Sequence, residues 1–271
     1  MIKRRIRSLI ARVAPAASSS GVRVLMYHDI GDPDPRDRMA LRVSPTRFVE
    51  QMTALRDDGC RVVPLSSVGD PPHVHGGRSV AITFDDGYRS HAWAAGVLRD
   101  FGFTATFFVV PRLLDGGHRA EPYWESWGHL DWEQLSMLAE QGFEVGAHSM
   151  THPDLTTCSG ARLDDEASGA RARIEERVGR PVRSFSYPFG RHDRLVRQAV
   201  ERAGYALACT SRYGINHGSG RLYAVHRTEV GGADDLMTFR SKLRGKFDWL
   251  GYWQDLTSWR EPRNPTNVDP S

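Results

Sequence analysis

Short apolar segments alternate along this chain with longer segments of helical spacing, and this alternation restricts the folds it can adopt. Strands are predicted at 22–28, 61–65, 79–84, 105–110, 143–148, 184–189, 206–210 and 224–230. Ser44-Pro45 and Asp131 are typical of helix starts within the intervening segments. Strands that alternate with helices pair in parallel, because parallel neighbours need a crossover connection. About seven such units in a chain of 271 residues predict a single α/β domain, closed as a barrel in preference to an open sheet.

Composition argues against several classes of protein. The net charge of +3 is small and dispersed, which disfavours a nucleic-acid partner. No apolar run approaches the ~20 residues that a membrane-spanning helix requires. The 3 cysteines are odd in number and lack CxxC spacing, so they are interpreted as reduced thiols in a reducing compartment.

The amino end is basic: residues 1–28 carry Lys and Arg side chains but no acidic one. Its apolar residues Ile2, Ile6, Leu9, Ile10 and Val13 share one helical face. Residues 1–14 are therefore predicted to form an amphipathic helix on an anionic membrane surface. The alternatives are a frayed tail, a helix packed on the domain, or an Arg-rich targeting peptide.

No continuous apolar core of a secretory signal is evident in this segment, so a cytoplasmic location is expected, peripheral to the inner membrane face. The expected organisation is a basic segment and linker at 1–21, a folded domain at 22–250 and a polar tail at 251–271.

Two adjacent acids, Asp85 and Asp86, follow the predicted strand 79–84, and Gly87 ends the run. Neighbouring carboxylates are costly to hold together, because like charges repel and burial disfavours ionisation. A metal cation or strong hydrogen bonds would offset this cost. A solvated Asp-Asp-Gly turn is the alternative. In a barrel, the ends of the strands are where chemistry is expected.

A histidine pair, His148 and His152, ends the strand 143–148. Pro153 disfavours a helical conformation at His152, so the two imidazoles are expected to converge from a strand end and a turn. Imidazole suits zinc and other transition metals, and two histidines with one carboxylate leave coordination positions open for water.

Three stretches in this order, TFDDG at 83–87, HSMTH at 148–152 and SYPFG at 186–190, resemble the motifs of the polysaccharide deacetylase family. This family is also known as the NodB-homology or carbohydrate esterase 4 family. The resemblance covers roughly residues 22–245 and implies a deformed (β/α) barrel. It also implies a divalent metal, zinc in the first place, with cobalt, nickel, manganese or iron as alternatives. By this resemblance Asp85 is the base, and Asp86, His148 and His152 are metal ligands.

The sequence departs from the family pattern at two places. The third motif commonly begins with an Arg that orients the base, where this chain has Ser186. Arg227 could supply that cation, or it could be a structural surface residue. The usual catalytic His near the carboxyl end is also missing, whereas His28 resembles the acid of a permuted subgroup that deacetylates poly-N-acetylglucosamine. A core or loop histidine is the alternative for His28.

The resemblance implies hydrolytic removal of N-acetyl groups from an amino-sugar polysaccharide, oligosaccharide or glycolipid precursor. Oxyanion or substrate binding is expected from Tyr187, Phe189 and Gly190, and sugar stacking from Tyr187, Phe189, Trp124 and Trp127. An O-acetyl esterase, another amide hydrolase on the same fold, and a non-catalytic carbohydrate-binding module remain open.

Overall fold

Parallel strand pairing builds the centre of the protein. The computed structural model describes residues 20–71, 78–117 and 127–252, and within them one sheet has the strand order β7-β6-β5-β4-β3-β1-β8, with β2 paired to β3 beside this path. The strands are β1 (Val22–Tyr27), β2 (Arg61–Val62), β3 (Ser79–Phe84), β4 (Thr106–Val109), β5 (Glu144–Ala147), β6 (Ser184–Ser186), β7 (Leu207–Cys209) and β8 (Arg227–Glu229). All of these strand pairings are parallel.

The sheet closes almost completely on itself. Residue Val225, just before β8, forms a parallel bridge with Cys209 of β7. The Val225 amide donates to the Ala208 carbonyl at 2.9 Å, and the Thr210 amide donates to the Val225 carbonyl at 2.9 Å. The predicted deformed (β/α) barrel of parallel strands in a single domain is confirmed.

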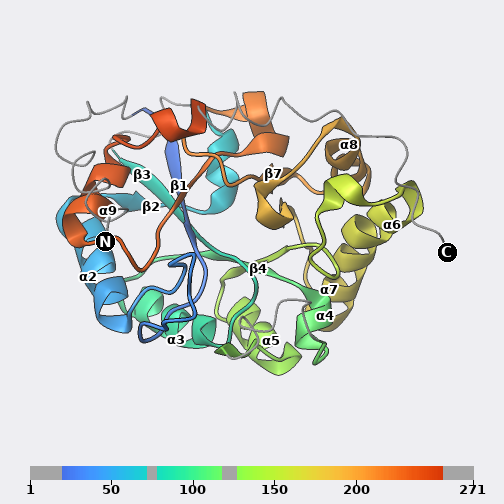
Figure 1. Cartoon of the computed structure of the whole chain (residues 1–271), viewed down its shortest axis with the longest axis horizontal. Helices are drawn as coiled ribbons and strands as arrows, with labels where there is room; N and C mark the ends of the chain where they lie inside the picture. The colour runs from blue at the N-terminus through green and yellow to red at the C-terminus, as the bar shows by residue number, and fades with distance from the viewer. Residues whose placement is uncertain (1–19, 72–77, 118–126, 253–271) are drawn as a thin grey trace.

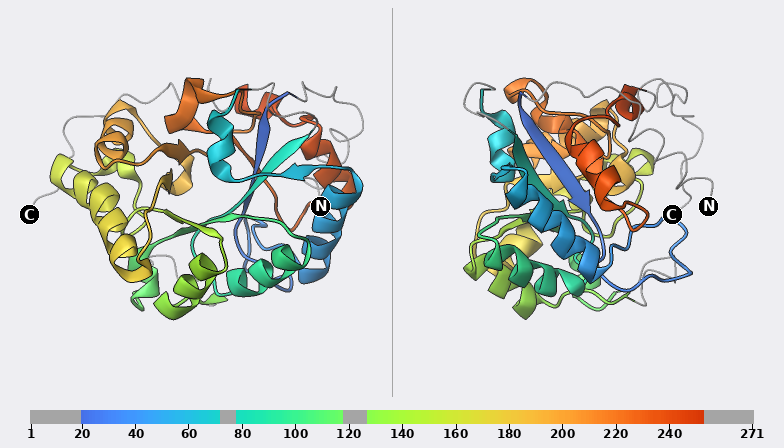
Figure 2. Two further views of the ribbon diagram at one scale, coloured as in Figure 1. Left: turned by 180° about the vertical axis from the view of Figure 1, so that it is seen from behind. Right: turned by 90° about the vertical axis from the view of Figure 1, so that its left-hand side faces the viewer.

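Helices surround the strands (Figures 1 and 2). They are α2 (Pro45–Asp57), α3 (Ser90–Asp100), α4 (Pro111–Leu114), α5 (Trp132–Glu140), α6 (Gly160–Asp164), α7 (Ala170–Val178), α8 (Arg194–Arg202) and α9 (Leu236–Leu243). The predicted helix starts are confirmed: Ser44 accepts from the Arg47 amide, and Asp131 forms a capping box with Gln134. None of the helices in the described part of the chain has the length and hydropathy to cross a membrane.

The two faces of the strands have different environments, because successive side chains point to opposite sides. On β3, Ile82 and Phe84 belong to the large core between the sheet and the helices. Ala81 belongs to a smaller cluster that includes Val24, Phe108 and Cys209. Thr83 and Asp85 are two and four residues after Ala81, so their side chains point to the same side of the sheet as that of Ala81. The strand therefore directs Asp85 away from the helix-facing core.

Two predictions of local structure are corrected. The sequence predicts a loop at 111–130, but in the structure Pro111 begins the short helix α4. The apolar spacing from Leu163 to Val178 predicts one uniform helix, whereas a π-helical segment, Asp165–Gly169, lies between α6 and α7. The predictions for residues 1–14 and for almost all of the tail at 251–271 lie outside the described residues.

Candidate active site

The two acids occupy the turn that follows β3. The Asp85 amide donates to the Tyr27 carbonyl at 2.9 Å, which extends the pairing of β1 and β3 by one residue. Asp86 then adopts a φ of 79° and Gly87 a φ of 70°. A Cβ on Gly87 would lie 3.2 Å from the Val109 Cγ1 atom, so the turn packs closely against β4. These left-handed residues turn the chain sharply and leave both acids buried at the strand end.

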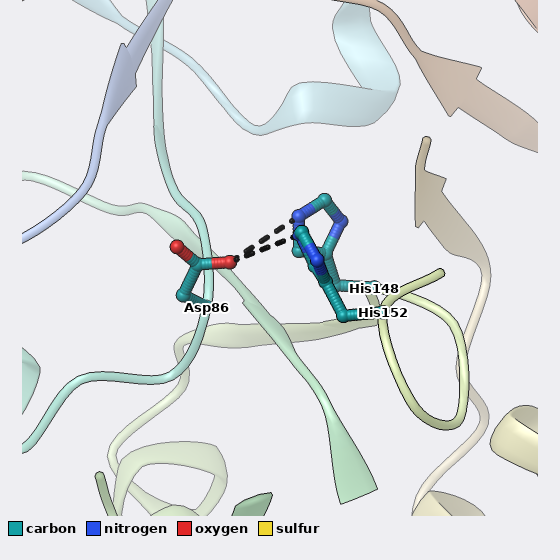
Figure 3. A group of neighbouring side chains, drawn as sticks. All are labelled: Asp86, His148 and His152. Carbon is teal, nitrogen blue, oxygen red and sulfur yellow. Dashed lines mark ion pairs between the residues drawn. The ribbon is translucent and has the colours of Figure 1, made fainter. Parts of the chain in front are cut away.

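The two histidines converge on Asp86, as the sequence predicts. His148 follows β5, and its amide donates to the Val109 carbonyl at 2.8 Å. Its Nε2 atom lies 3.4 Å from Asp86 Oδ1, and the Nε2 atom of His152 lies 3.5 Å from the same oxygen. In Figure 3 both rings face the Asp86 carboxylate. His152 reaches this place through a left-handed turn, with φ of 62°, in agreement with the expected break from helical geometry.

This trio has the donor set and the spacing of a metal site. One ligand atom from each of Asp86, His148 and His152 lies within 4.8 Å of the others, and no other such group occurs among the residues that the structure describes. The Nδ1 atom of His148 lies 2.7 Å from the Ser186 carbonyl oxygen, which can only accept. His148 Nδ1 therefore carries the proton, and the lone pair of Nε2 faces Asp86. Burial lowers the pKa of His148, against the raising effect of Asp85 and Asp86, which favours the neutral, ligating form.

Asp85 is held by a different partner. Arg227 is wholly buried, and its guanidinium donates two hydrogen bonds of 2.7 Å to the two carboxylate oxygens of Asp85. It also donates to the Ser186 hydroxyl at 2.9 Å, and that hydroxyl lies 3.2 Å from Asp85. Burial alone would raise the pKa of Asp85, but Arg227 outweighs it and lowers the pKa to about 2. Arg227 is thus no surface residue, and Asp85 is ionised beside the trio.

His28 lies at the end of β1, opposite Asp85 across the β1–β3 pairing. Its carbonyl oxygen lies 2.8 Å from the Nε2 atom of the fully buried His91. The Nδ1 atom of His28 is buried without a hydrogen-bond partner in the described structure. Among the described residues, His91 and His192 each also have one buried ring nitrogen without a hydrogen-bond partner, so this feature alone does not distinguish His28.

The third motif shows which of its residues are accessible. Tyr187 is wholly buried and donates through its hydroxyl to the Tyr223 carbonyl at 3.1 Å, so the expectation that it stacks on sugar is wrong. The amides of Tyr187 and Gly190 donate to the carbonyls of Cys209 and Tyr187 at 3.0 and 2.8 Å. The amides of Tyr187 and Gly190 are therefore already used in backbone hydrogen bonds. Among the three expected oxyanion donors, the Phe189 amide is the one that stays a candidate. The Phe189 side chain is 59% exposed, and its ring lies 4.8 Å from that of His152.

The expected aromatic platform in the loop before α5 is also corrected. Trp127 is only 8% exposed, and its indole nitrogen donates to Asp34 at 3.1 Å. Its ring packs beneath the Arg42 guanidinium. Burial makes Trp127 a loop anchor and removes it from the sugar-stacking candidates, whereas Trp124 lies outside the described residues.

One polar residue next to the histidines was missed at the sequence level. Glu166 is buried in the π-helical segment and accepts hydrogen bonds from the loop between His148 and His152. The sequence did contain a sign of this role, since Glu166 stands next to Ala167 in the apolar stripe 163–178. An acid at such a position is buried and therefore needs hydrogen-bond donors around it.

Comparison with known proteins identifies relatives of this chain. Residues 73–208, about half of the chain, match the family model described as polysaccharide deacetylase. A chitooligosaccharide deacetylase of Bradyrhizobium sp. (strain ANU 289) is 31% identical over 151 residues, which are 53% of this chain and 61% of that enzyme. The chain thus spans less than two thirds of that relative.

Solved structures agree in fold. A polysaccharide deacetylase from Bacillus cereus is 27% identical, with a TM-score of 0.70 over 82% of this chain and 69% of its own. IcaB from Ammonifex degensii is 23% identical, with a TM-score of 0.71 over 86% of this chain and 99% of its own. These matches show that the barrel fold is shared with solved structures.

Proposed function

Because the chain belongs to the polysaccharide deacetylase family, we propose that it hydrolyses the N-acetyl groups of an amino-sugar polysaccharide, oligosaccharide or glycolipid precursor with the help of a divalent metal ion. Asp86, His148 and His152 would hold the ion, and their one carboxylate and two imidazoles suit zinc, with cobalt, nickel, manganese or iron as alternatives. Bound there, the ion would polarise the acyl carbonyl and make water more acidic.

The observation that carries this proposal is the separation of the two acids. Asp86 faces the histidines, whereas Asp85 is tied to Arg227 and lies 3.9 Å from His148 Nε2. A protein that only binds carbohydrate has no need of an ionised, oriented carboxylate beside a metal site. Hydrolysis needs that carboxylate, because the attacking water must lose a proton.

Each remaining residue has a proposed task. Asp85 accepts the proton of the attacking water, and Arg227 with Ser186 keeps its carboxylate fixed and charged. The Phe189 amide donates to the developing oxyanion. His28 gives a proton to the departing amine, which is a poor leaving group without one. The exposed Phe189 ring offers a face for the sugar.

The test is acetate release from a panel of N-acetylated and O-acetylated sugars, with and without a chelator, for the parent protein and Asp85→Asn. The near-isosteric variant should keep its metal and lose ~10²–10⁴-fold in rate on the N-acetyl substrate. Activity confined to O-acetyl sugars would indicate an esterase instead. Binding without acetate release from any substrate would indicate a carbohydrate-binding module.

The proposal also includes the surroundings in which the protein acts. We place it in the cytoplasm, with residues 1–14 in contact with the anionic inner face of the membrane and an N-acetylated carbohydrate as its partner. The basic and apolar pattern of this segment supports that contact.

A further inference from the structure

The loop that carries His152 is held by one buried carboxylate. Glu166 is only 2% exposed, and its Oε2 atom accepts from the amides of Met150 and Thr151, each at 2.9 Å. Its Oε1 atom accepts from the Thr151 hydroxyl. Three donors from two successive residues therefore converge on one side chain.

This loop has little backbone pairing of its own. Ser149 and His152 both adopt left-handed conformations, with φ of 60° and 62°, so the chain between them cannot continue as strand or helix. The His152 amide donates to the Ser149 hydroxyl at 2.9 Å, and the two amides between them go to Glu166. Side chains therefore satisfy the amides of three successive residues that regular structure would otherwise pair.

The π-helical segment Asp165–Gly169 is the element that presents this carboxylate. Such segments are rare in proteins, but those that occur are often found at functional sites. The extra residue in the turn redirects a side chain. The conformation is close-packed: a Cβ on Gly169 would lie 2.6 Å from the Asp165 Oδ1 atom and 3.5 Å from the Met150 Cε atom. The segment thus packs against the same loop that Glu166 binds.

We propose that Glu166 is a positioning residue for the metal site: by fixing the loop 149–152 it holds His152 where its imidazole meets that of His148 and the carboxylate of Asp86. The inference rests on the proposed metal site. Charge-assisted hydrogen bonds from two amides and a hydroxyl fix the loop more firmly than neutral ones would. Left-handed conformations at Ser149 and His152 are strained and persist only where neighbouring contacts enforce them. Residues that orient ligands in this way typically contribute 10–100-fold to metal affinity.

The test measures zinc affinity, by competition with a chromogenic chelator, for Glu166→Ala, Glu166→Gln and Thr151→Val. The matched control is Asp165→Asn, an exposed acid in the same π-helical segment. Glu166→Ala should weaken zinc binding about 10–100-fold. Glu166→Gln should recover most of the affinity, since its amide oxygen can accept both amide hydrogens and its NH₂ can donate to Thr151. Thr151→Val should have a smaller effect than Glu166→Ala, and Asp165→Asn none.

A purely structural role predicts a different result. Glu166→Ala would then lower the melting temperature of the metal-free protein, yet leave the affinity of the folded protein at the parent value, which would overturn the proposal. If Glu166→Ala does not fold, Thr151→Val provides the test because it removes one donor to Glu166, and a zinc affinity equal to that of Asp165→Asn would overturn the proposal. His152→Ala separates the two proposals: parent zinc affinity in that variant would refute the metal site itself.

Discussion

At the scale of single residues, the pairing of Asp85 with Arg227 fixes the orientation of one acid beside the two histidines. Both side chains are buried, so the pair is well shielded from solvent, and its two parallel hydrogen bonds fix the carboxylate plane. Removing one partner of a buried ion pair typically costs ~3–5 kcal/mol, because the other charge is left without compensation. The arginine is therefore best probed by a substitution that keeps its charge.

Arg227→Lys should retain the cation but lose the two-point contact with Asp85 and the bond from Nε to the Thr210 carbonyl. We expect turnover of an N-acetyl sugar to fall about 10²-fold, at the lower end of the range of general-base assistance, while zinc content stays near the parent value. The matched control is Arg240→Lys, whose partner Asp58 lies near the surface. That control should change neither quantity, and equal effects of the two substitutions would contradict the role of Arg227.

His28→Ala should separate amide from ester hydrolysis. Its buried Nδ1 has no partner within the described structure, so the substitution breaks no hydrogen bond of the ring at that atom. An amine must be protonated to leave, whereas the alkoxide of an activated ester scarcely needs a proton. We expect a loss of ~10²–10⁴-fold on an N-acetyl sugar and a much smaller loss on an activated acetate ester. Rates that fall equally on both substrates, or on neither, would exclude His28 as the acid.

At the scale of elements, the connections after the strands hold the unusual backbone conformations. Among the described residues, five other than glycine have positive φ, and four of them lie at the site: Asp86, Ser149, His152 and Phe189. Strain of this kind gathers where the surrounding structure dictates a functional geometry. The scaffold of parallel strands is regular, and the irregular turns at its edge direct the side chains.

Gly190→Ala should disturb the connection after β6. Gly190 has a φ of 68°, and a Cβ there would lie 2.5 Å from Ser211 Oγ and 2.6 Å from the Ser211 amide nitrogen. We expect a lower melting temperature together with reduced turnover, because the adjacent Phe189 must shift. Gly179→Ala is the control, since its φ is also 68° but a Cβ there has open space. It should show only the cost of a left-handed conformation for alanine, about 1–2 kcal/mol, with full turnover.

At the scale of the whole molecule, closure of the barrel brings distant segments to one edge and buries titratable groups in the process. Burial lowers the pKa of both His91 and His192 to about 4. In the unfolded chain these side chains bind a proton near pH 6.5. Between these two pH values the unfolded state therefore binds more protons than the native state, so stability falls as the pH decreases.

The metal-free protein should accordingly lose free energy of unfolding between pH 6.5 and 5, by roughly 1.4 kcal/mol per pH unit for each such histidine. Urea denaturation across this range measures it. His192→Gln should make the decline with pH shallower than in the parent protein. An identical slope in the parent and His192→Gln would contradict the assignment.

Deleting residues 1–14 should release the protein from anionic vesicles, because the deletion removes five Lys or Arg side chains and the apolar face beside them. Turnover of a small soluble substrate should stay unchanged. Sedimentation with vesicles at low salt measures binding, and neutral vesicles provide the control. Equal binding of the full and shortened chains would rule out the membrane contact.

The sequence by itself determined the architecture and the four residues at the centre of the site. Strand and helix periodicities are local properties, and a strand end followed by adjacent acids or a histidine pair is visible without neighbours. Since parallel strands end at one edge of a barrel, Asp85, Asp86, His148 and His152 could be expected to meet there, and they do.

Tertiary structure alone decided the partners that come from elsewhere in the chain. Arg227 lies 142 residues from Asp85, and both its burial and its hydrogen bonds depend on how β8 closes the barrel. Contacts with distant segments also bury two aromatic candidates: Tyr187 donates to the Tyr223 carbonyl, and Trp127 donates to Asp34. Glu166 lies in the π-helical segment Asp165–Gly169, and its side chain accepts a hydrogen bond from the loop 149–152 that carries His152. Helical spacing in the sequence shows neither the π-helical turn nor this contact. Local patterns specify which side chains can act, but burial and pairing arise from non-local contacts that no segment of sequence contains.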